Sequence, residues 1–139
     1  MPLVKWGPLY ALGIEELDAH HEKLIGLLNR AYDSFARGAS EQELKELVDQ
    51  LADYATYHFS CEERLMERVS FPKLAEHKKA HHSYTCKIAE VRRNFDAKKN
   101  WLTLEILRFL QIWLTQHILG ADAEFARFEP DLDVMISAS

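Results

Sequence analysis

The residues most suited to chemistry are five histidines and two carboxylic acids that recur at helical spacing. They are His21, His58, Glu62, His77, His81, His117 and Asp122. The pairs at 58 and 62 and at 77 and 81 are four residues apart, so each pair projects from one face of an α-helix. Imidazole and carboxylate are ligands for iron and related transition metals. The pattern therefore predicts a metal site.

The elements that must position these residues are long helices. Between Ala39 and Leu119 the only glycine or proline is Pro72, and such a pattern favours helices over strands. We expect helices at about 18–37, 40–68, 73–95 and 101–118. Asp18 is a plausible N-cap of the first helix, Gly38 ends it, and Ser40 with Glu43 resembles a capping box for the second.

Short connections make neighbouring helices antiparallel, so we expect an all-α, up-down-up-down four-helix bundle. Chain 1–139 is then a single domain, with an extended arm at 1–17, the bundle at about 18–128 and a tail at 129–139. We expect Trp6, Leu9 and Ile14 to pin the arm to the bundle. The residues predicted to point inward are Leu17, Leu24, Leu28, Ala31, Phe35, Leu44, Leu47, Leu51, Tyr54, Leu65, Leu74, Tyr84, Ile88, Val91, Phe95, Ile106, Leu110 and Trp113.

The candidate ligands also lie at one height in this bundle. Glu62 and His77 are each about seven or eight residues from the turn near residue 70, and the other ligands match in the same way across the remaining turns. All four helices thus deliver ligands to one layer about two turns thick. Asp122 follows His117 by five residues, which returns to the same face only if the helix loosens near Gly120.

The number of ligands predicts two metal ions. Buried without a cation, these groups would cost several kcal/mol each, and seven ligands exceed the four that one zinc takes. If the carboxylates and a solvent oxygen bridge two metals and the histidines divide three and two, one metal is six-coordinate. The other keeps an open position in an apolar core. Such a site suits iron and a small neutral guest such as dioxygen.

The motifs that carry these ligands resemble the hemerythrin family in its bacterial single-domain form. The motifs are the segment Ile14–His21, HFxxEExxM from His58, HxxxH from His77, and WLxxHIxxxD from Trp113. The resemblance implies reversible dioxygen binding at a non-haem di-iron centre with an oxo or hydroxo bridge, and no catalytic residue. It places His77, His81 and His117 on one iron, His21 and His58 on the other, and Glu62 and Asp122 between them. Leu114 and Ile118 match positions that line the oxygen pocket.

Three details stay open at this point. Helical periodicity permits either His20 or His21 as the first ligand, and motif alignment selects His21. His82, next to His81, should face away from the site. Ligating histidines usually need a partner for the other ring nitrogen, and we consider Tyr54, Tyr57 and Tyr84 as candidates.

Composition limits the function further. The net charge of -5 argues against nucleic acid or an anionic membrane as a partner. Two isolated cysteines and no recognisable signal or membrane-spanning run predict a cytoplasmic protein. Dioxygen is the expected partner, either for a carrier or store or for the sensing domain of a larger chemotaxis receptor with a signalling module. The alternatives are a di-iron enzyme acting on peroxide, nitric oxide or iron, and a structural zinc bundle.

Overall fold

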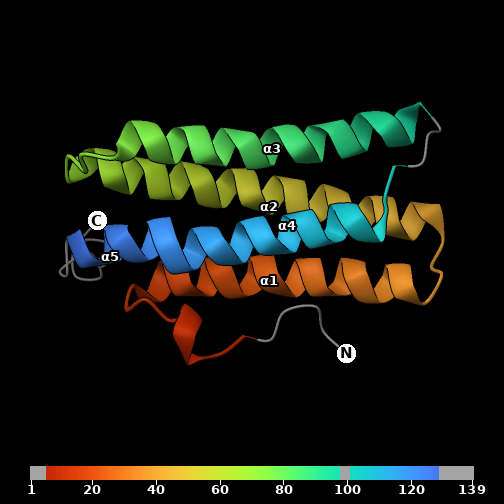
Figure 1. Ribbon diagram of the computed structural model, residues 1–139, viewed down its shortest axis with the longest axis horizontal. Coiled ribbons are helices and arrows are strands. Elements are labelled where there is room, and N and C mark those ends of the chain that lie inside the picture. The colour runs from red at the N-terminus through yellow and green to blue at the C-terminus, as the bar shows by residue number, and fades with distance from the viewer. Residues whose placement is uncertain (1–5, 98–100, 129–139) are drawn as a thin grey trace.

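Four long helices make up most of the computed structural model, which describes residues 6–97 and 101–128. They are α1 (Glu15–Ala36), α2 (Glu41–Arg68), α3 (Leu74–Asp96) and α4 (Leu104–His117). The helices lie side by side, and each long helix runs opposite to the one before it (Figure 1). Contacts join α1 to α2, α2 to α3 and α1 to α4. The predicted all-α, antiparallel four-helix bundle is confirmed.

The first helix begins earlier than the sequence predicts, at Glu15. Asp18 is therefore not its N-cap. The Asp18 carboxylate instead accepts hydrogen bonds from the backbone N–H groups of Leu12 (2.9 Å) and Gly13 (3.1 Å). Gly13 has φ +94°, a conformation that favours glycine, and it turns the arm into the helix. Asp18 thus ties the arm to the first turn of α1.

The second helix begins as predicted, because the Ser40 hydroxyl accepts the Glu43 N–H at 3.1 Å. The reciprocal half of the capping box is replaced by an ion pair, in which Arg37 donates to the Glu43 carboxylate at 3.2 Å. Every residue predicted to point inward is buried or half-buried. On α2, Val48 and Ala55 are buried where Leu47 and Tyr54 were expected, because the buried line advances alternately by three and four residues.

The fourth helix differs most from the expected 101–118. It begins at Leu104 because the Thr103 side chain accepts the Ile106 N–H at 3.1 Å. Beyond His117 the chain continues as a π-helical turn, η2 (Ile118–Asp122), and then as α5 (Ala123–Phe128). The predicted loosening around Gly120 is therefore a π-helix, which inserts one extra residue into the turn.

The apolar core forms two clusters with a polar layer between them. The larger cluster runs along the bundle and includes Leu24, Ala55 and Ile118. The smaller one lies near the α2–α3 turn; its buried members are Ile14, Leu17, Leu65, Met66, Phe71 and Phe125. In the sequence of α1 the candidate ligand His21 falls between the two clusters, and on α2 Glu62 does so, while His58 lies beside Phe59 of the larger cluster. The core thus frames the polar layer from both sides.

The arm follows the prediction in part. A short 3-10 turn, η1 (Pro8–Tyr10), carries it past the bundle, Trp6 packs against the larger cluster and Ile14 is buried. The side chain of Leu9 and the predicted tail at 129–139 lie outside the described residues, and the division of the chain into arm, bundle and tail stays a prediction. In the part of the chain that the structure describes, no helix is long and apolar enough to cross a membrane.

Candidate metal centre

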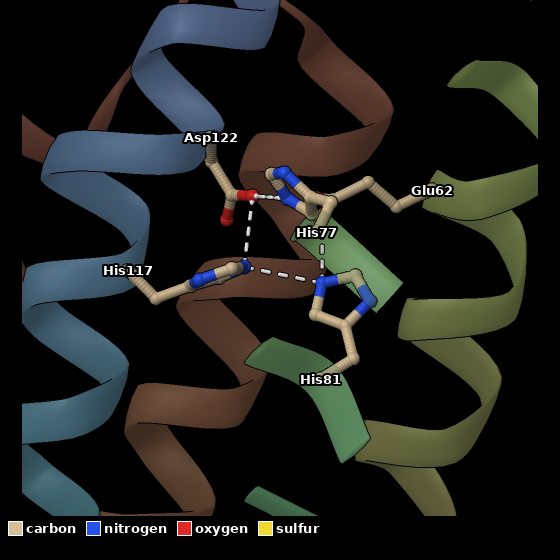
Figure 2. A group of neighbouring side chains, drawn as sticks. All are labelled: Glu62, His77, His81, His117 and Asp122. Carbon is tan, nitrogen blue, oxygen red and sulfur yellow. Dashed lines mark hydrogen bonds and ion pairs between the residues drawn. The ribbon is translucent and has the colours of Figure 1, made fainter. Parts of the chain in front are cut away.

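The seven predicted ligands meet in the polar layer, and all seven are buried. α1 supplies His21, α2 supplies His58 and Glu62, and α3 supplies His77 and His81. His117 ends α4 and Asp122 ends η2. Figure 2 shows Glu62, His77, His81, His117 and Asp122 converging from three sides on one point. All seven side chains thus lie in one layer of the bundle and face its interior, as their helical spacing predicted.

Five donor atoms form the larger of two groups. They are Nε2 of His77, His81 and His117 together with one oxygen each of Glu62 and Asp122. Nε2 of His77 lies 2.9 Å from Glu62 Oε1 and 2.8 Å from Asp122 Oδ1. Nε2 of His81 lies 3.1 Å from Glu62 Oε1 and 3.1 Å from Nε2 of His117. We call this set the five-donor group.

Four donor atoms form the second set, the four-donor group, which takes the other oxygen of each carboxylate. Nε2 of His21 lies 3.0 Å from Asp122 Oδ2 and 3.7 Å from Glu62 Oε2. Nε2 of His58 lies 3.3 Å from Glu62 Oε2. Glu62 and Asp122 therefore each face one group with one oxygen and the other group with the second oxygen.

Asp122 reaches this position because of the π-helical turn. Five residues separate it from His117, which in a regular α-helix would turn the carboxylate well away from the imidazole. The extra residue of η2 lengthens the turn so that Oδ1 of Asp122 lies 3.3 Å from Nε2 of His117. The local unwinding therefore completes both donor groups.

Two observations show that the donors fit cations. Ligands about 2.1 Å from an ion and at right angles to one another stand about 3 Å apart, and neighbouring atoms of the five-donor group stand 2.8–3.3 Å apart. In addition, four buried polar atoms at this layer have no hydrogen-bond partner among the described residues. They are both ring nitrogens of His21, Glu62 Oε2 and Asp122 Oδ2. A cation at the four-donor group would satisfy three of these atoms, Nε2 of His21, Glu62 Oε2 and Asp122 Oδ2, whereas Nδ1 of His21 would carry the ring proton.

The electrostatics agree with a site built for positive charge. Burial opposes a charge on His21, but the carboxylates of Asp122 and Glu62 outweigh it and raise the pKa of His21 to about 10. The same balance raises the pKa of His77 to about 9. Burial alone would raise the pKa of Glu62, yet the surrounding histidines hold it well below its usual range. Without metal, protons on His21 and His77 take the place of the cations.

Two donors have hydrogen-bond partners that sequence reasoning missed. Nδ1 of His81 lies 2.7 Å from a carboxylate oxygen of Glu63, and Nδ1 of His58 lies 2.9 Å from Nδ1 of His20. Of the tyrosine candidates, Tyr84 is not such a partner, because its hydroxyl is buried without a hydrogen-bond partner among the described residues. Tyr57 is half exposed, and the ring of Tyr54 meets that of His20. Glu63 follows Glu62 directly and gave no periodic signal of its own.

The two adjacent histidine pairs have different outcomes. His21, the residue that motif alignment selected, lies in the four-donor group, whereas Nδ1 of His20 contacts Nδ1 of His58, on the side of that ring away from the donor atoms. His82 is exposed, as predicted, and its Nε2 lies 3.3 Å from the Cys86 sulfur. Aromatic rings also clamp the donors: Phe59 stacks on His81 at 4.0 Å between centroids and Trp113 stacks on His117 at 4.6 Å.

Comparisons with known proteins agree with this geometry. A family model described as the hemerythrin HHE cation-binding domain matches residues 12–128. A bacteriohemerythrin of Stenotrophomonas maltophilia is 34% identical, with 91% of this chain and 81% of the relative covered. A bacteriohemerythrin of Clostridium acetobutylicum is 29% identical, covering 86% and 96%. The crystal structure of a wild-type hemerythrin matches with a TM-score of 0.86 at 26% identity, covering 94% and 98%. The chain therefore belongs to the hemerythrin HHE cation-binding domain family.

Proposed function

We propose that this protein binds dioxygen reversibly at a pair of iron ions. In this proposal the five-donor group holds one iron and the four-donor group holds the other. The observation that carries the proposal is the division of both carboxylates, each of which gives one oxygen to each group. Bridging of this kind requires two ions close together, and membership of the hemerythrin family favours iron.

The unequal donor count supports binding at one iron. With one shared solvent oxygen, the five-donor group fills six coordination positions, whereas the four-donor group fills five. Iron bound there would supply electrons and one open position for dioxygen. The protein supplies the surroundings: Leu114 and Ile118 are fully buried in the larger apolar cluster, and we propose that they line the pocket. An apolar pocket favours a small neutral guest and resists charged ones.

The buried imidazoles and carboxylates favour a binding protein over an enzyme, because nearly all of them belong to the two donor groups. Among the described residues, every buried imidazole and carboxylate belongs to the two donor groups, except His20, which contacts the donor His58. Apart from His20, the described residues thus leave no buried histidine or carboxylic acid free to act on a substrate. The role is that of a carrier or store, or of an oxygen-sensing domain. A sensing role requires a signalling module, so the reading frame around this sequence distinguishes the two.

The decisive experiment measures iron content and visible spectra on one sample. We expect two irons per chain and a colour change that reverses as the sample is cycled between anaerobic and aerobic buffer. One zinc per chain would contradict the iron proposal. Oxidation that does not reverse, together with sustained turnover of peroxide, would instead establish an enzyme.

Placement of the pocket is tested by exchanging Ile118 for Glu. An acid at this fully buried position should occupy or block the open coordination position and suppress the spectrum of the oxygenated form. Ile112, on α4 and about half exposed, provides the matched control, because Ile112→Glu introduces the same charge in solvent. Unchanged oxygen binding in Ile118→Glu would show that the pocket lies elsewhere.

A further inference from the structure

His20 is a buried imidazole that the two donor groups do not use. Only 5% of its surface is exposed, although it lies on α1 directly beside the donor His21. Its Nδ1 lies 2.9 Å from Nδ1 of His58, and the two rings meet edge to face, with centroids 5.0 Å apart and planes at 89°. This distance is that of a hydrogen bond between ring nitrogens.

The chemistry of His58 decides which ring donates. Nε2 of His58 faces Glu62 Oε2 at 3.3 Å, on the side where a metal would bind. A neutral imidazole that binds metal through Nε2 carries its proton on Nδ1. His58 therefore donates from Nδ1, and Nδ1 of His20 accepts. The proton of His20 is then on Nε2, which faces the exposed carboxylate of Glu16 at 3.9 Å.

The surroundings hold His20 in this orientation. Tyr54 meets the His20 ring edge to face at 5.8 Å between centroids, and the Tyr57 ring lies at 5.3 Å. With its proton on Nε2, His20 is a neutral ring whose Nδ1 lone pair faces His58, which is the form required of an acceptor.

The two donor groups therefore differ in the partners behind them. In the five-donor group, Nδ1 of His81 meets the carboxylate of Glu63 at 2.7 Å, whereas in the four-donor group Nδ1 of His58 meets a neutral ring. A negative acceptor increases the basicity of a ligating imidazole more than a neutral one does. The imidazole ligands of the two groups thus have different hydrogen-bond partners at Nδ1: a carboxylate for His81 and a neutral ring for His58.

We propose that His20 is a positioning residue for the metal of the four-donor group. It fixes the tautomer and ring orientation of His58, so that the Nε2 lone pair points at the ion. The inference rests on the proposed function in one respect, since it takes His58 as a ligand. It adds a role for a residue that lies outside both donor groups.

The test compares metal binding by three variants, with Co²⁺ added anaerobically to metal-free protein and followed by its visible absorption. His20→Phe keeps a flat ring but removes the acceptor, and we expect one of the two binding steps to weaken by about 10–100-fold. The other step should be unchanged. His20→Gln, whose amide oxygen accepts a hydrogen bond, should restore most of the lost affinity. His82→Phe is the matched control, because His82 also neighbours a donor but is exposed.

A second measurement reports the hydrogen bond itself. In protein loaded with diamagnetic Zn²⁺, the Nδ1 proton of His58 should give a ring N–H signal in NMR that exchanges slowly with solvent. The signal should persist in His82→Phe and exchange rapidly in His20→Phe. This readout does not depend on oxygen binding.

The outcomes separate the two proposals. Wild-type protein that takes up one Co²⁺ or none would contradict the paired metal site. Two normal binding steps in His20→Phe would contradict the role of His20 alone. Equal weakening of both steps in His20→Phe and His20→Gln, with lower melting temperatures, would mean that His20 acts only in packing and would also overturn the inference.

Discussion

At the scale of single residues, the two carboxylates carry the most weight because each serves both donor groups. Glu62 faces four histidines, and its two oxygens are divided between Nε2 of His77 and His81 on one side and Nε2 of His58 and His21 on the other. Asp122 repeats the arrangement from η2. In the proposed pair of ions, removing either charge should therefore affect both metals, whereas removing one histidine should affect mainly one.

Exchange of Glu62 for Gln should prevent the protein from binding two ions together. The amide removes the negative charge and is a much weaker ligand for iron than carboxylate, so iron content should fall from the expected pair to about one or none. Elemental analysis after anaerobic loading measures this. Glu67→Gln, on the same helix but exposed, is the control and should retain both ions.

Metal loading should release protons near neutral pH. In the metal-free protein the pKa values of His21 and His77 are raised to about 10 and about 9, so both rings are charged at about pH 7 and must deprotonate before Nε2 can bind a metal. Metal affinity should therefore fall as pH decreases. Addition of Zn²⁺ in weak buffer with a pH indicator measures the release, and affinity that does not vary below pH 9 would contradict it.

The same shifts predict how the metal-free fold depends on pH. Because the pKa of His21 and of His77 is higher in the folded chain than the ordinary value of about 6.5, their contribution to stability is fully present below that value. It is lost as pH rises through about 9 to 10. Metal-loaded protein should lack this alkaline loss, since the rings are then deprotonated ligands.

At the scale of elements, the π-helical turn η2 is the feature on which the site depends most. The turn brings Asp122 onto the same face as His117 although five residues separate them, and Gly120 lies within it. The sequence predicted the loosening because no regular helix puts both side chains on one face. It could not show that the helix resumes as α5 after the turn, since Phe125 packs into the small cluster that only the folded bundle creates.

Insertion of one alanine after Gly120 should remove the metal. The insertion lengthens the five-residue step from His117 to Asp122 by one residue and turns the carboxylate by about 100°, so its oxygens leave both donor groups and metal content should fall as in Glu62→Gln. Deletion of Gly120 is the control, because it leaves a shorter step that in a regular α-helix lies only about 40° from the same face, and this variant should keep its metal. Full metal content in the insertion variant would show that the placement of Asp122 by η2 is not required.

Most of the fold and six of the seven donors could be predicted because both depend on helical periodicity, whereas the choice of His21 over His20 needed the motif resemblance. Hydrophobic stripes and ligand spacing are properties of one helix at a time, and equal distance from a turn sets height. The partners behind the ligands could not be predicted in this way. The contact of His20 with His58 depends on how α1 rotates against α2, and the link from Asp18 to Leu12 depends on the path of the arm.

At the scale of the whole molecule, the site divides the hydrophobic core into two clusters. All four long helices pass through the polar layer, so no helix can leave it without exposing buried charge. Two carboxylates and five imidazoles in one layer destabilise the metal-free bundle, because each buried polar atom without a partner costs free energy. Metal bound in this layer would instead hold α1, α2, α3 and α4 together through their ligands.

Metal removal should therefore lower the melting temperature. A ligand held only by the folded state and present at 100 times its dissociation constant adds about 2.7 kcal/mol, which for a domain of this size corresponds to about 10 °C. Circular dichroism of metal-loaded and chelator-treated protein measures the shift. Glu62→Gln supplies the control, since its melting temperature should respond little to added metal.

One contact within this layer gives the molecule a built-in optical reporter. Trp113 stacks on the His117 ring at an interplanar angle of 15°, whereas Trp101 packs against Phe95 and Trp6 stacks with Tyr10 on the arm. Iron beside His117 would quench the emission of the nearby indole and leave the other two as a steady background. The fluorescence of a single side chain thus follows the occupancy of the five-donor group without any added label.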